Sequence, residues 1–196
     1  VERAQTYPYV FMKPASTTLN HHGGEIQIPD ISPDNIDWEC ELGVVIGKKA
    51  KGVSEAEALD YVAGYTVVND ISDRGFRPNL NRKERDRDKF FDWQHGKWHD
   101  GSCPVGPCVA TPATISDPQN LPLKLTVNGE VHQDASTALQ IFPVPAVIEF
   151  ISSFVTLEPG DIISTGTAAG VGHPKGIHLR AGDQVEASIE GIGALK

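Results

Sequence analysis

The chain has 196 residues, of which 39% are hydrophobic, and this is enough to form a sizeable core in one globular domain. Its 17 basic and 26 acidic residues give a net charge of −9, which argues against binding to the phosphate backbone of nucleic acids. No run approaches the roughly 18 apolar residues of a membrane helix and the first residues do not form a signal peptide, so we expect a cytoplasmic protein with no membrane partner.

Short strand-like runs separated by turn residues dominate the chain. In chain order, the predicted strands cover residues 9–13, 39–46, 64–69, 108–110, 123–128, 130–133, 161–165 and 184–189. Asn128 and Gly129 join two of these runs and tolerate the positive φ that a type I′ turn requires. Residues 123–133 are therefore predicted to form a β-hairpin.

Two segments carry helix signals. Ser54-Glu55-Ala56-Glu57 matches a capping box, in which Ser54 accepts a hydrogen bond from the backbone N–H of Glu57, and predicts a helix that runs to about Tyr61 or Val62. A second helix is predicted to begin near Pro145, with an apolar stripe formed by Val147, Ile148, Ile151 and Phe154. Both helices are expected to cover a sheet, which predicts one strand-rich α+β domain over residues 1–196.

Two further patterns limit the function classes. The one dense basic segment, residues 82–89, alternates basic and acidic side chains and is typical of a solvated face or loop. Three cysteines, Cys40, Cys103 and Cys108, form no Cys-x-x-Cys pair, and their odd number argues against a disulfide framework. We therefore expect a reducing compartment and buried structural cysteines.

Glu39 and Glu41 are one residue apart in the predicted strand 39–46, so both carboxylates point to one face. Like charges at this spacing repel one another unless a cation lies between them. Asp70 follows the strand 64–69, and a strand–helix–strand path would bring it to the same end of the sheet. Three converging carboxylates predict a Mg²⁺, Mn²⁺ or Ca²⁺ site with open positions for water or substrate. The spacing is equally compatible with Asp70 as a strand-end cap and the glutamates in solvent.

Three other segments carry polar side chains. Lys97 lies in a loop punctuated by glycine and proline that can hold an ammonium group near a metal, although a surface lysine is the simpler interpretation of this residue alone. His95 and His99 have the spacing of a helical zinc pair, but nearby glycines weaken a helix, so we discount zinc. Residues 166–172 form a glycine-rich loop without a nucleotide-binding motif, which either presents backbone N–H groups and the Thr167 hydroxyl to a small anion or is a plain turn.

A series of short motifs in one order resembles the fumarylacetoacetate hydrolase family over nearly the whole chain. The motifs are Phe11-Met12-Lys13-Pro14, Glu39-x-Glu41, Val68-Asn69-Asp70-Ile71-Ser72-x-Arg74, Gly96-Lys97-x-x-Asp100, Pro104-x-Gly106-Pro107, Val127-Asn128-Gly129, Leu157-Glu158-Pro159-Gly160-Asp161 and Thr165-Gly166-Thr167-x-x-Gly170-Val171-Gly172. Each motif is weak alone, whereas their common order is a strong signal. The resemblance implies a strand-rich α+β fold, the mixed β-sandwich roll of that family's C-terminal type.

The resemblance also implies site residues and partners. By position, Glu39, Glu41 and Asp70 match the family's metal ligands, for Mg²⁺ or Mn²⁺ with Ca²⁺ as a substitute in crystals. Lys97 matches its catalytic, substrate-polarising lysine. The family's substrate-binding positions correspond to Lys13, Arg74 and Thr167. The implied partners are a small-molecule 2-oxo acid and a second copy of the chain in a homodimer.

The implied activity is hydrolysis of C–C bonds in small 2-oxo or 1,3-dicarbonyl acids, of the acylpyruvate or fumarylpyruvate type, through a metal-stabilised enolate. The alternatives at the same site are decarboxylation of an oxaloacetate-like acid and isomerisation or tautomerisation of an aromatic-degradation intermediate. Residues 1–9 contain no counterpart of the family's His-Glu pair, so we expect either that an upstream lid segment is missing or that this is a catalytically inactive keto-acid-binding homologue. Arg77 stands where family members often carry Gln, and residues 75–93 are longer than usual, which affects specificity.

Overall fold

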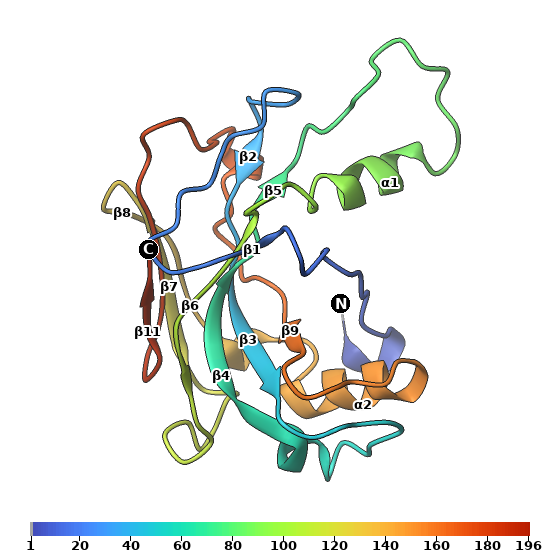
Figure 1. Ribbon diagram of the computed structural model, residues 1–196, viewed down its shortest axis with the longest axis vertical. Helices are drawn as coiled ribbons and strands as arrows, with labels where there is room; N and C mark the ends of the chain where they lie inside the picture. Colours follow the sequence, from blue (N-terminus) through green and yellow to red (C-terminus); the bar gives the residue numbers. More distant parts are fainter. Residues whose placement is uncertain (1) are drawn as a thin grey trace.

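Two β-sheets packed face to face form most of the structure, a computed structural model that describes residues 2–196 (Figure 1). The five-stranded sheet contains, in spatial order, β1 (Leu19–Asn20), β6 (Cys103–Ala110), β4 (Val62–Asn69), β3 (Cys40–Ile46) and β9 (Ile162–Ser164). The four-stranded sheet contains β11 (Gly193–Leu195), β10 (Val185–Ile189), β7 (Pro122–Val127) and β8 (Glu130–Ser136). A short third sheet pairs β2 (Ile36–Asp37) with β5 (Ser72–Asp73).

The larger sheet is mixed, because β1 pairs with β6 in parallel while β6, β4, β3 and β9 pair antiparallel to one another. The described residues also form the α-helices α1 (Asp88–His95) and α2 (Val144–Phe154). Short 3₁₀ helices complete the structure as η1 (Arg3–Gln5), η2 (Ala58–Tyr61), η3 (Thr137–Leu139) and η4 (His173–Lys175). The predicted strand-rich α+β roll is therefore confirmed.

Alternation along β3 separates the core from the polar face of the sheet. Cys40, Leu42 and Val44 are all 0% exposed and belong to the hydrophobic core, into which β7 and β10 of the facing sheet also project. Full burial of a Leu or Val side chain stabilises a fold by about 1.5–3 kcal/mol. A register slip of one residue would replace these side chains with Glu39 and Glu41, so the apolar face strongly specifies the register of β3.

The predicted hairpin is confirmed. Asn128 has a φ of 52° and Gly129 a φ of 82°, which are the two positive values that a type I′ turn requires. The turn joins β7 to β8, and Val127 pairs directly with Glu130. Two residues with the right backbone freedom are sufficient to set this connection.

Helix α2 covers one side of the core as predicted, but its stripe is shorter. The helix begins at Val144, and Val147, Ile148 and Ile151 are buried in the core. Phe154 is 56% exposed, so its predicted place on the buried stripe is wrong. This residue ends the helix and packs on the ring of Phe150 at 5.2 Å between centroids, rather than on the sheet.

The prediction of a helix after Ser54 is wrong. The Ser54 hydroxyl donates to the Glu57 carboxylate at 2.5 Å, while the Glu57 backbone N–H binds the Ser54 carbonyl and not its hydroxyl. The chain then forms only the 3₁₀ helix η2. Because β4 begins at Val62, too few residues remain to repay the cost of nucleating an α-helix.

The predicted strand at residues 9–13 is wrong. These residues form irregular chain, and the Met12 carbonyl accepts a hydrogen bond from the indole N–H of Trp98 at 2.7 Å.

The charged segment 82–89 is mostly exposed loop, as predicted. Helix α1, which was not predicted, begins at its end, where Asp88 pairs with Arg82 and Arg85. These ion pairs fix the start of the helix.

The cysteines divide into two classes. Cys40 and Cys103 are buried as predicted, and burial raises the pKa of these thiols to about 12 and about 11, respectively. Cys108 is exposed, so the prediction of a buried residue is wrong for this position, which lies in a solvent-facing stretch of β6. None of the helices within residues 2–196 combines the length and apolarity that crossing a membrane requires.

Candidate metal-binding site

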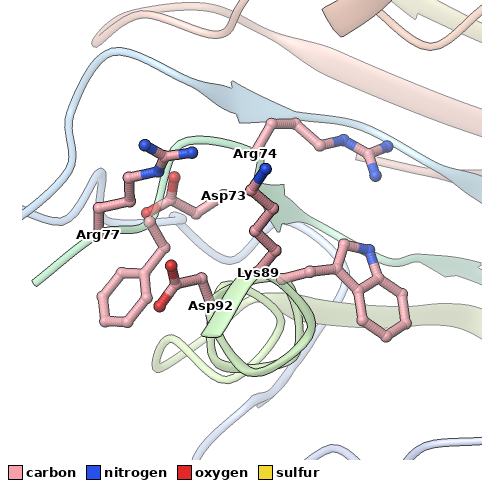
Figure 2. A pocket seen from close by; sticks show the side chains of 7 residues that line it. Asp73, Arg74, Arg77, Lys89 and Asp92 are labelled. Carbon is pink, nitrogen blue, oxygen red and sulfur yellow. The ribbon is translucent and has the colours of Figure 1, made fainter. Parts of the chain in front are cut away.

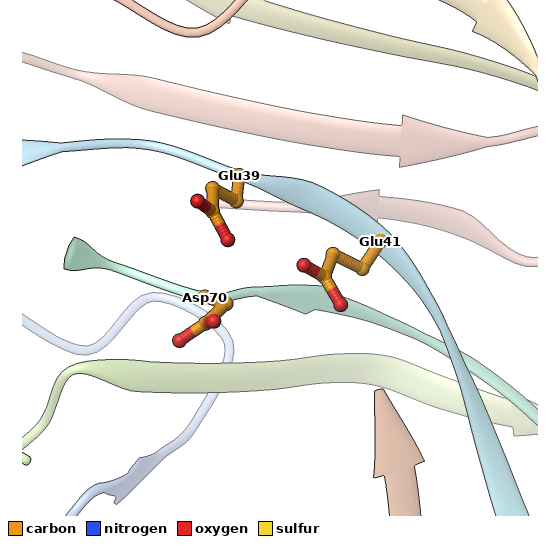
Figure 3. Close-up of side chains that lie close together, drawn as sticks. All are labelled: Glu39, Glu41 and Asp70. Atoms are coloured by element: carbon orange, nitrogen blue, oxygen red, sulfur yellow. The ribbon is translucent and has the colours of Figure 1, made fainter. Parts of the chain in front are cut away.

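Three carboxylates meet at one end of the β3–β4 pair (Figure 3). The antiparallel register pairs Cys40 with Asn69, and the Asp70 backbone N–H donates to the Glu39 carbonyl at 2.9 Å. Asp70 is thereby brought beside Glu39 and Glu41, and one oxygen from each carboxylate lies within 4.8 Å of the other two. All three residues are buried, so the interpretation in which the glutamates face solvent is wrong.

Lys97 lies between two of these carboxylates. Its Nζ donates to Glu39 Oε2 at 2.8 Å and to Asp70 Oδ2 at 2.7 Å, and its side chain is 3% exposed. The tight turn after α1 that positions it requires Gly96, because a Cβ there would lie 2.3 Å from the Asp73 carbonyl oxygen. Lys97 is therefore not a surface lysine, and its buried ammonium group is neutralised by two ion pairs.

Two further cations predicted to bind substrate reach the same cluster. Lys13 Nζ donates to Asp70 Oδ1 at 2.7 Å. Arg74 donates from Nε to Asp37 Oδ2 at 3.0 Å and from Nη2 to Glu39 Oε1 at 2.5 Å. The Lys13 and Arg74 side chains are 12% and 16% exposed, so solvent screens these contacts only in part.

Glu41 has a different environment from Glu39 and Asp70. Its Oε2 accepts hydrogen bonds from Ser164 Oγ at 2.6 Å and from the Gly166 N–H at 2.7 Å. Among the residues that the structure describes, the salt bridges of the cluster reach only Glu39 and Asp70 of the three. Burial, together with the charges of Asp70 and Glu39, raises the pKa of Glu41 to about 8. Glu41 is therefore the carboxylate that gains most from a nearby cation.

The pKa of Asp70 is shifted in the opposite direction to that of Glu41. Burial would raise the pKa of this carboxyl, but the ammonium groups of Lys13 and Lys97 outweigh burial and hold the pKa below its ordinary value. Burial would likewise lower the pKa of Lys97, yet Asp70 and Glu39 keep it above its ordinary value. These groups therefore stay ionised at neutral pH.

The donor set fits a hard divalent cation. Three carboxylates supply the oxygen ligands that Mg²⁺ and Mn²⁺ prefer, and their oxygens lie close enough together to share one ion. Protein donors orient each carboxylate, as is usual around bound metals. A cation beside Glu41 would also favour its ionised form.

Thr167 is not brought onto the carboxylates. Its hydroxyl donates to the Cys40 carbonyl at 3.0 Å and accepts from Gln133 Nε2 at 2.8 Å. The glycine-rich loop 166–172 does present backbone N–H groups to anions, but these anions are the protein's own carboxylates. The Gly166 N–H binds Glu41, and the Gly172 N–H binds Asp37 Oδ1 at 2.7 Å.

Sequence reasoning missed several residues that build the site. Asp37 is 0% exposed and accepts from Arg74, and its position two residues before Glu39 offered a period-two signal for it. Ser164 had no comparable signal, because its contact with Glu41 depends on how β9 pairs with β3. His99, considered above for zinc, instead lies with Nε2 3.1 Å from Asp73 Oδ2.

Known proteins are similar to this chain over nearly its whole length. The family model described as Fumarylacetoacetate (FAA) hydrolase C-terminal matches residues 1–196. A 2,4-didehydro-3-deoxy-L-rhamnonate hydrolase from Sphingomonas sp. (strain SKA58) is 46% identical over 194 residues, which are 97% of this chain and 64% of that protein. The 4-hydroxyphenylacetate degradation bifunctional isomerase/decarboxylase of Salmonella dublin is 42% identical over 197 residues, 96% of this chain and 40% of that protein. The chain thus spans less than two thirds of either relative.

A solved structure shows the same fold. Maleylpyruvate hydrolase from Sphingobium sp. SYK-6, in complex with manganese(II) ion and pyruvate, superposes with a TM-score of 0.80 at 31% identity. The match covers 94% of this chain and 61% of that one. A protein with this fold therefore binds both a divalent metal and a 2-oxo acid.

Proposed function

The chain belongs to the fumarylacetoacetate hydrolase family, and on that premise we propose that it is a divalent-metal-dependent hydrolase. Its substrates would be small 2-oxo or 1,3-dicarbonyl acids of the acylpyruvate type, in which it cleaves a C–C bond. The observation that carries this proposal is the buried cluster of Glu39, Glu41 and Asp70, two of whose members bind the ammonium group of Lys97.

In this proposal, Glu39, Glu41 and Asp70 hold Mg²⁺ or Mn²⁺. The ion, when bound, supplies Lewis-acid polarisation of substrate oxygens. Lys97 places a fixed positive charge beside the same carboxylates, where negative charge develops on the leaving fragment.

Three further residues would bind the substrate. Lys13 and Arg74 reach the cluster from two sides and would bind the substrate carboxylate through charge-assisted hydrogen bonds. Thr167 would contact substrate only after its hydroxyl exchanges one of its partners, the Cys40 carbonyl or Gln133.

The bond changes are those of an acylpyruvate hydrolysis. The oxygen of a water molecule bonds to the acyl carbonyl carbon, and the C–C bond to the pyruvate fragment breaks. The electron pair passes to that fragment as an enolate. One proton of the water ends on the enolate carbon, which gives pyruvate, and the other is released when the acid formed from the acyl group ionises. The cations around the carboxylate cluster suit a step that leaves negative charge on a 2-oxo acid.

Two similar proteins support this substrate class. The name of the Sphingomonas relative's substrate denotes a 2,4-dioxo acid, which contains the acylpyruvate grouping. Maleylpyruvate is also an acylpyruvate, and the hydrolase of that name was solved with manganese and pyruvate. An acylpyruvate is therefore the substrate class that we place first.

Other reactions at the same site are a second candidate. The Salmonella relative is named as an isomerase/decarboxylase, which favours decarboxylation of an oxaloacetate-like acid or an isomerisation (tautomerisation). These reactions also develop enolate charge, so the same residues would serve. A third candidate is a homologue that binds keto acids without catalysis.

Product analysis separates these candidates. The protein is incubated with acetylpyruvate, fumarylpyruvate or oxaloacetate in the presence of Mg²⁺, Mn²⁺ or EDTA. We expect pyruvate and the matching acid from an acylpyruvate, only with metal, and loss of this activity in Lys97→Met but not in the exposed control Lys48→Met. Release of CO₂ from oxaloacetate alone would favour the decarboxylase, and faster keto–enol exchange of oxaloacetate without CO₂ release would favour the tautomerase. Binding with none of these changes would favour the inactive homologue.

We also propose a homodimer. Phe90 and Phe91 on α1 are 54% and 43% exposed and offer apolar surface for such a contact. Sedimentation velocity should give a species of twice the chain mass, whereas a monomer at micromolar concentration would contradict this part of the proposal.

A further inference from the structure

A pocket of about 190 Å³ opens between the end of β5 and helix α1 (Figure 2). Its walls include Asp73, Arg74, Arg77, Lys89, Asp92 and Trp93. Two of these residues also border the candidate metal site, because Arg74 donates to Glu39 and the Trp93 ring centroid lies 5.9 Å from Lys97 Nζ. The pocket and the carboxylate cluster therefore adjoin one another at Arg74 and Trp93.

The acidic residues of the pocket wall already have partners. Asp73 accepts hydrogen bonds from Ser32 Oγ at 2.9 Å and from the Gly75 N–H at 3.0 Å, and it lies beside His99. Asp92 binds the guanidinium group of Arg82 through both carboxylate oxygens. Both carboxylates are thus oriented by protein groups outside the pocket wall, and the charge of Asp92 is also balanced by the Arg82 guanidinium group.

The cationic side chains of the pocket wall differ in whether they already form salt bridges. Arg74 already binds Asp37 and Glu39. Arg77 and Lys89 are exposed and form no salt bridge with any of residues 2–196. The hydrogen bond from Arg82 is the main cause that holds the pKa of Asp92 low, and the charge of Arg77 contributes less to this shift. Figure 2 shows both side chains extending from the wall toward the region beside Asp73. The pocket therefore presents two cations that are available to a ligand.

We propose that Arg77 and Lys89 bind a second carboxylate of the substrate, so that this protein prefers 2-oxo acids that carry a remote carboxylate. This inference rests on the proposed function, because the first carboxylate and the 2-oxo group are held at the metal site. A guanidinium group can bind a carboxylate through two parallel hydrogen bonds, and an ammonium group adds a third donor. A doubly charged phosphate is less suited, because the Asp73 carboxylate borders the pocket without a salt bridge to Lys or Arg among residues 2–196 and would repel two charges more strongly than one.

The test compares two ligands that differ in their far end. 2-Oxoadipate and 2-oxohexanoate have the same chain length, but only the first carries a remote carboxylate, and neither contains the 1,3-dicarbonyl group that hydrolysis requires. Binding of each to the Mg²⁺-loaded protein is measured by isothermal titration calorimetry. We expect 2-oxoadipate to bind about tenfold more tightly, the ratio that one net charge-assisted hydrogen bond supplies.

The variants assign this preference to the two cations. Arg77→Gln and Lys89→Gln keep hydrogen-bonding capacity but remove the charge, and each should lower the ratio of affinities to about threefold. The double variant should bind both ligands equally. Lys83→Gln is the matched control, because Lys83 is an exposed cation of the same segment that does not line the pocket.

Three results would overturn the inference. Equal affinities of the two acids for the unmodified protein would show that these cations do not select the ligand. A preference for 2-oxoadipate that the double variant retains would show the same. In both cases, metal-dependent binding of both acids would leave the proposed function intact. If neither acid binds in the presence of Mg²⁺, the proposed function fails together with this inference. Unchanged thermal unfolding midpoints in the variants exclude loss of fold as the cause.

Discussion

The Nζ atom of Lys97 lies 2.7 Å from Oδ2 of Asp70, and neither side chain is more than 5% exposed. Asp70 follows strand β4 and Lys97 follows helix α1, so this contact joins the five-stranded sheet to the turn after helix α1. Burial alone would favour the neutral form of both groups, but each charge stabilises the other. The pair therefore keeps a positive charge next to the carboxylate cluster at neutral pH.

Removing one ligand carboxylate should abolish tight metal binding. In Glu39→Gln or Glu41→Gln, one anionic donor becomes a neutral amide, and the affinity for Mn²⁺ should fall by more than about tenfold. Isothermal titration calorimetry measures this change. Glu130→Gln is the control, since Glu130 is exposed at the start of β8 and should leave the isotherm unchanged. An unchanged Mn²⁺ isotherm in both site variants would remove the basis of the proposed metal site.

Metal binding should release a proton. The pKa of Glu41 is about 8 in the folded protein, so this carboxyl is mostly protonated at pH 7 and must ionise to bind a cation. The affinity should rise with pH up to about 8 and then level off. Titrations at pH 7 in two buffers of different ionisation enthalpy should give close to one released proton. Heats that are the same in both buffers, after correction for dilution, would contradict this prediction.

Glu41 should also make stability depend on pH when EDTA is present. Its ordinary pKa is 4.5, so between about pH 4.5 and 8 the unfolded chain ionises while the folded protein retains the proton. The contribution of this group to the free energy of unfolding is fully present below pH 4.5 and is lost as pH rises to 8, by an amount on the order of 5 kcal/mol. Urea unfolding of the unmodified protein and of Glu41→Gln, compared across this range, isolates the effect. Parallel curves for the two proteins would argue against it.

Loss of the buried ammonium group should destabilise the fold. Lys97→Met leaves Glu39 with Arg74 and Asp70 with Lys13 but removes the cation that they share, and breaking a buried ion pair in this way costs about 3–5 kcal/mol. The loss should be smaller near pH 5 than at pH 7, because protonation of one carboxylate relieves the excess negative charge. Urea unfolding at both pH values measures the difference, with Lys48→Met as the exposed control. Equal stability of Lys97→Met and the control at pH 7 would show that the pair contributes nothing.

Gln133 should connect the glycine-rich loop to the metal-binding strand. This residue is 0% exposed, accepts from the Cys40 N–H at 2.9 Å, and donates to Thr167 Oγ1 at 2.8 Å and to the Ala168 carbonyl at 2.9 Å. Gln133→Leu removes this partner from the Cys40 N–H and the Ala168 carbonyl, while the Thr167 hydroxyl keeps the Cys40 carbonyl, and it should lower the free energy of unfolding by about 3 kcal/mol. Amide exchange of Gly166 should also become faster. A change no larger than that of the exposed control Gln27→Leu would be evidence against this connection.

Local sequence patterns predicted the structure correctly where adjacent residues alone determine the backbone conformation. Asn128 and Gly129 have the backbone freedom for the turn between β7 and β8, and the result is the predicted hairpin. Local patterns failed where another part of the chain determined which secondary structure formed. The segment after Ser54 has a capping-box sequence but forms only a 3₁₀ turn, because β4 begins at Val62. Helix α1 was missed because ion pairs, and not an apolar stripe, hold its first turn.

The sequence by itself determined that Glu39 and Glu41 share one face of a strand. Side chains alternate along extended backbone, and the apolar residues that alternate with the two glutamates, Trp38, Cys40 and Leu42, are buried in the core. Only the tertiary structure decided that Lys97, Lys13 and Arg74 reach these carboxylates and that, within residues 2–196, Glu41 forms no salt bridge. Spacing along the chain does not specify which distant charges are buried together. That choice is made when the turn after α1 packs against the end of β4, where Lys97 and Asp70 each offset the cost of burying the other.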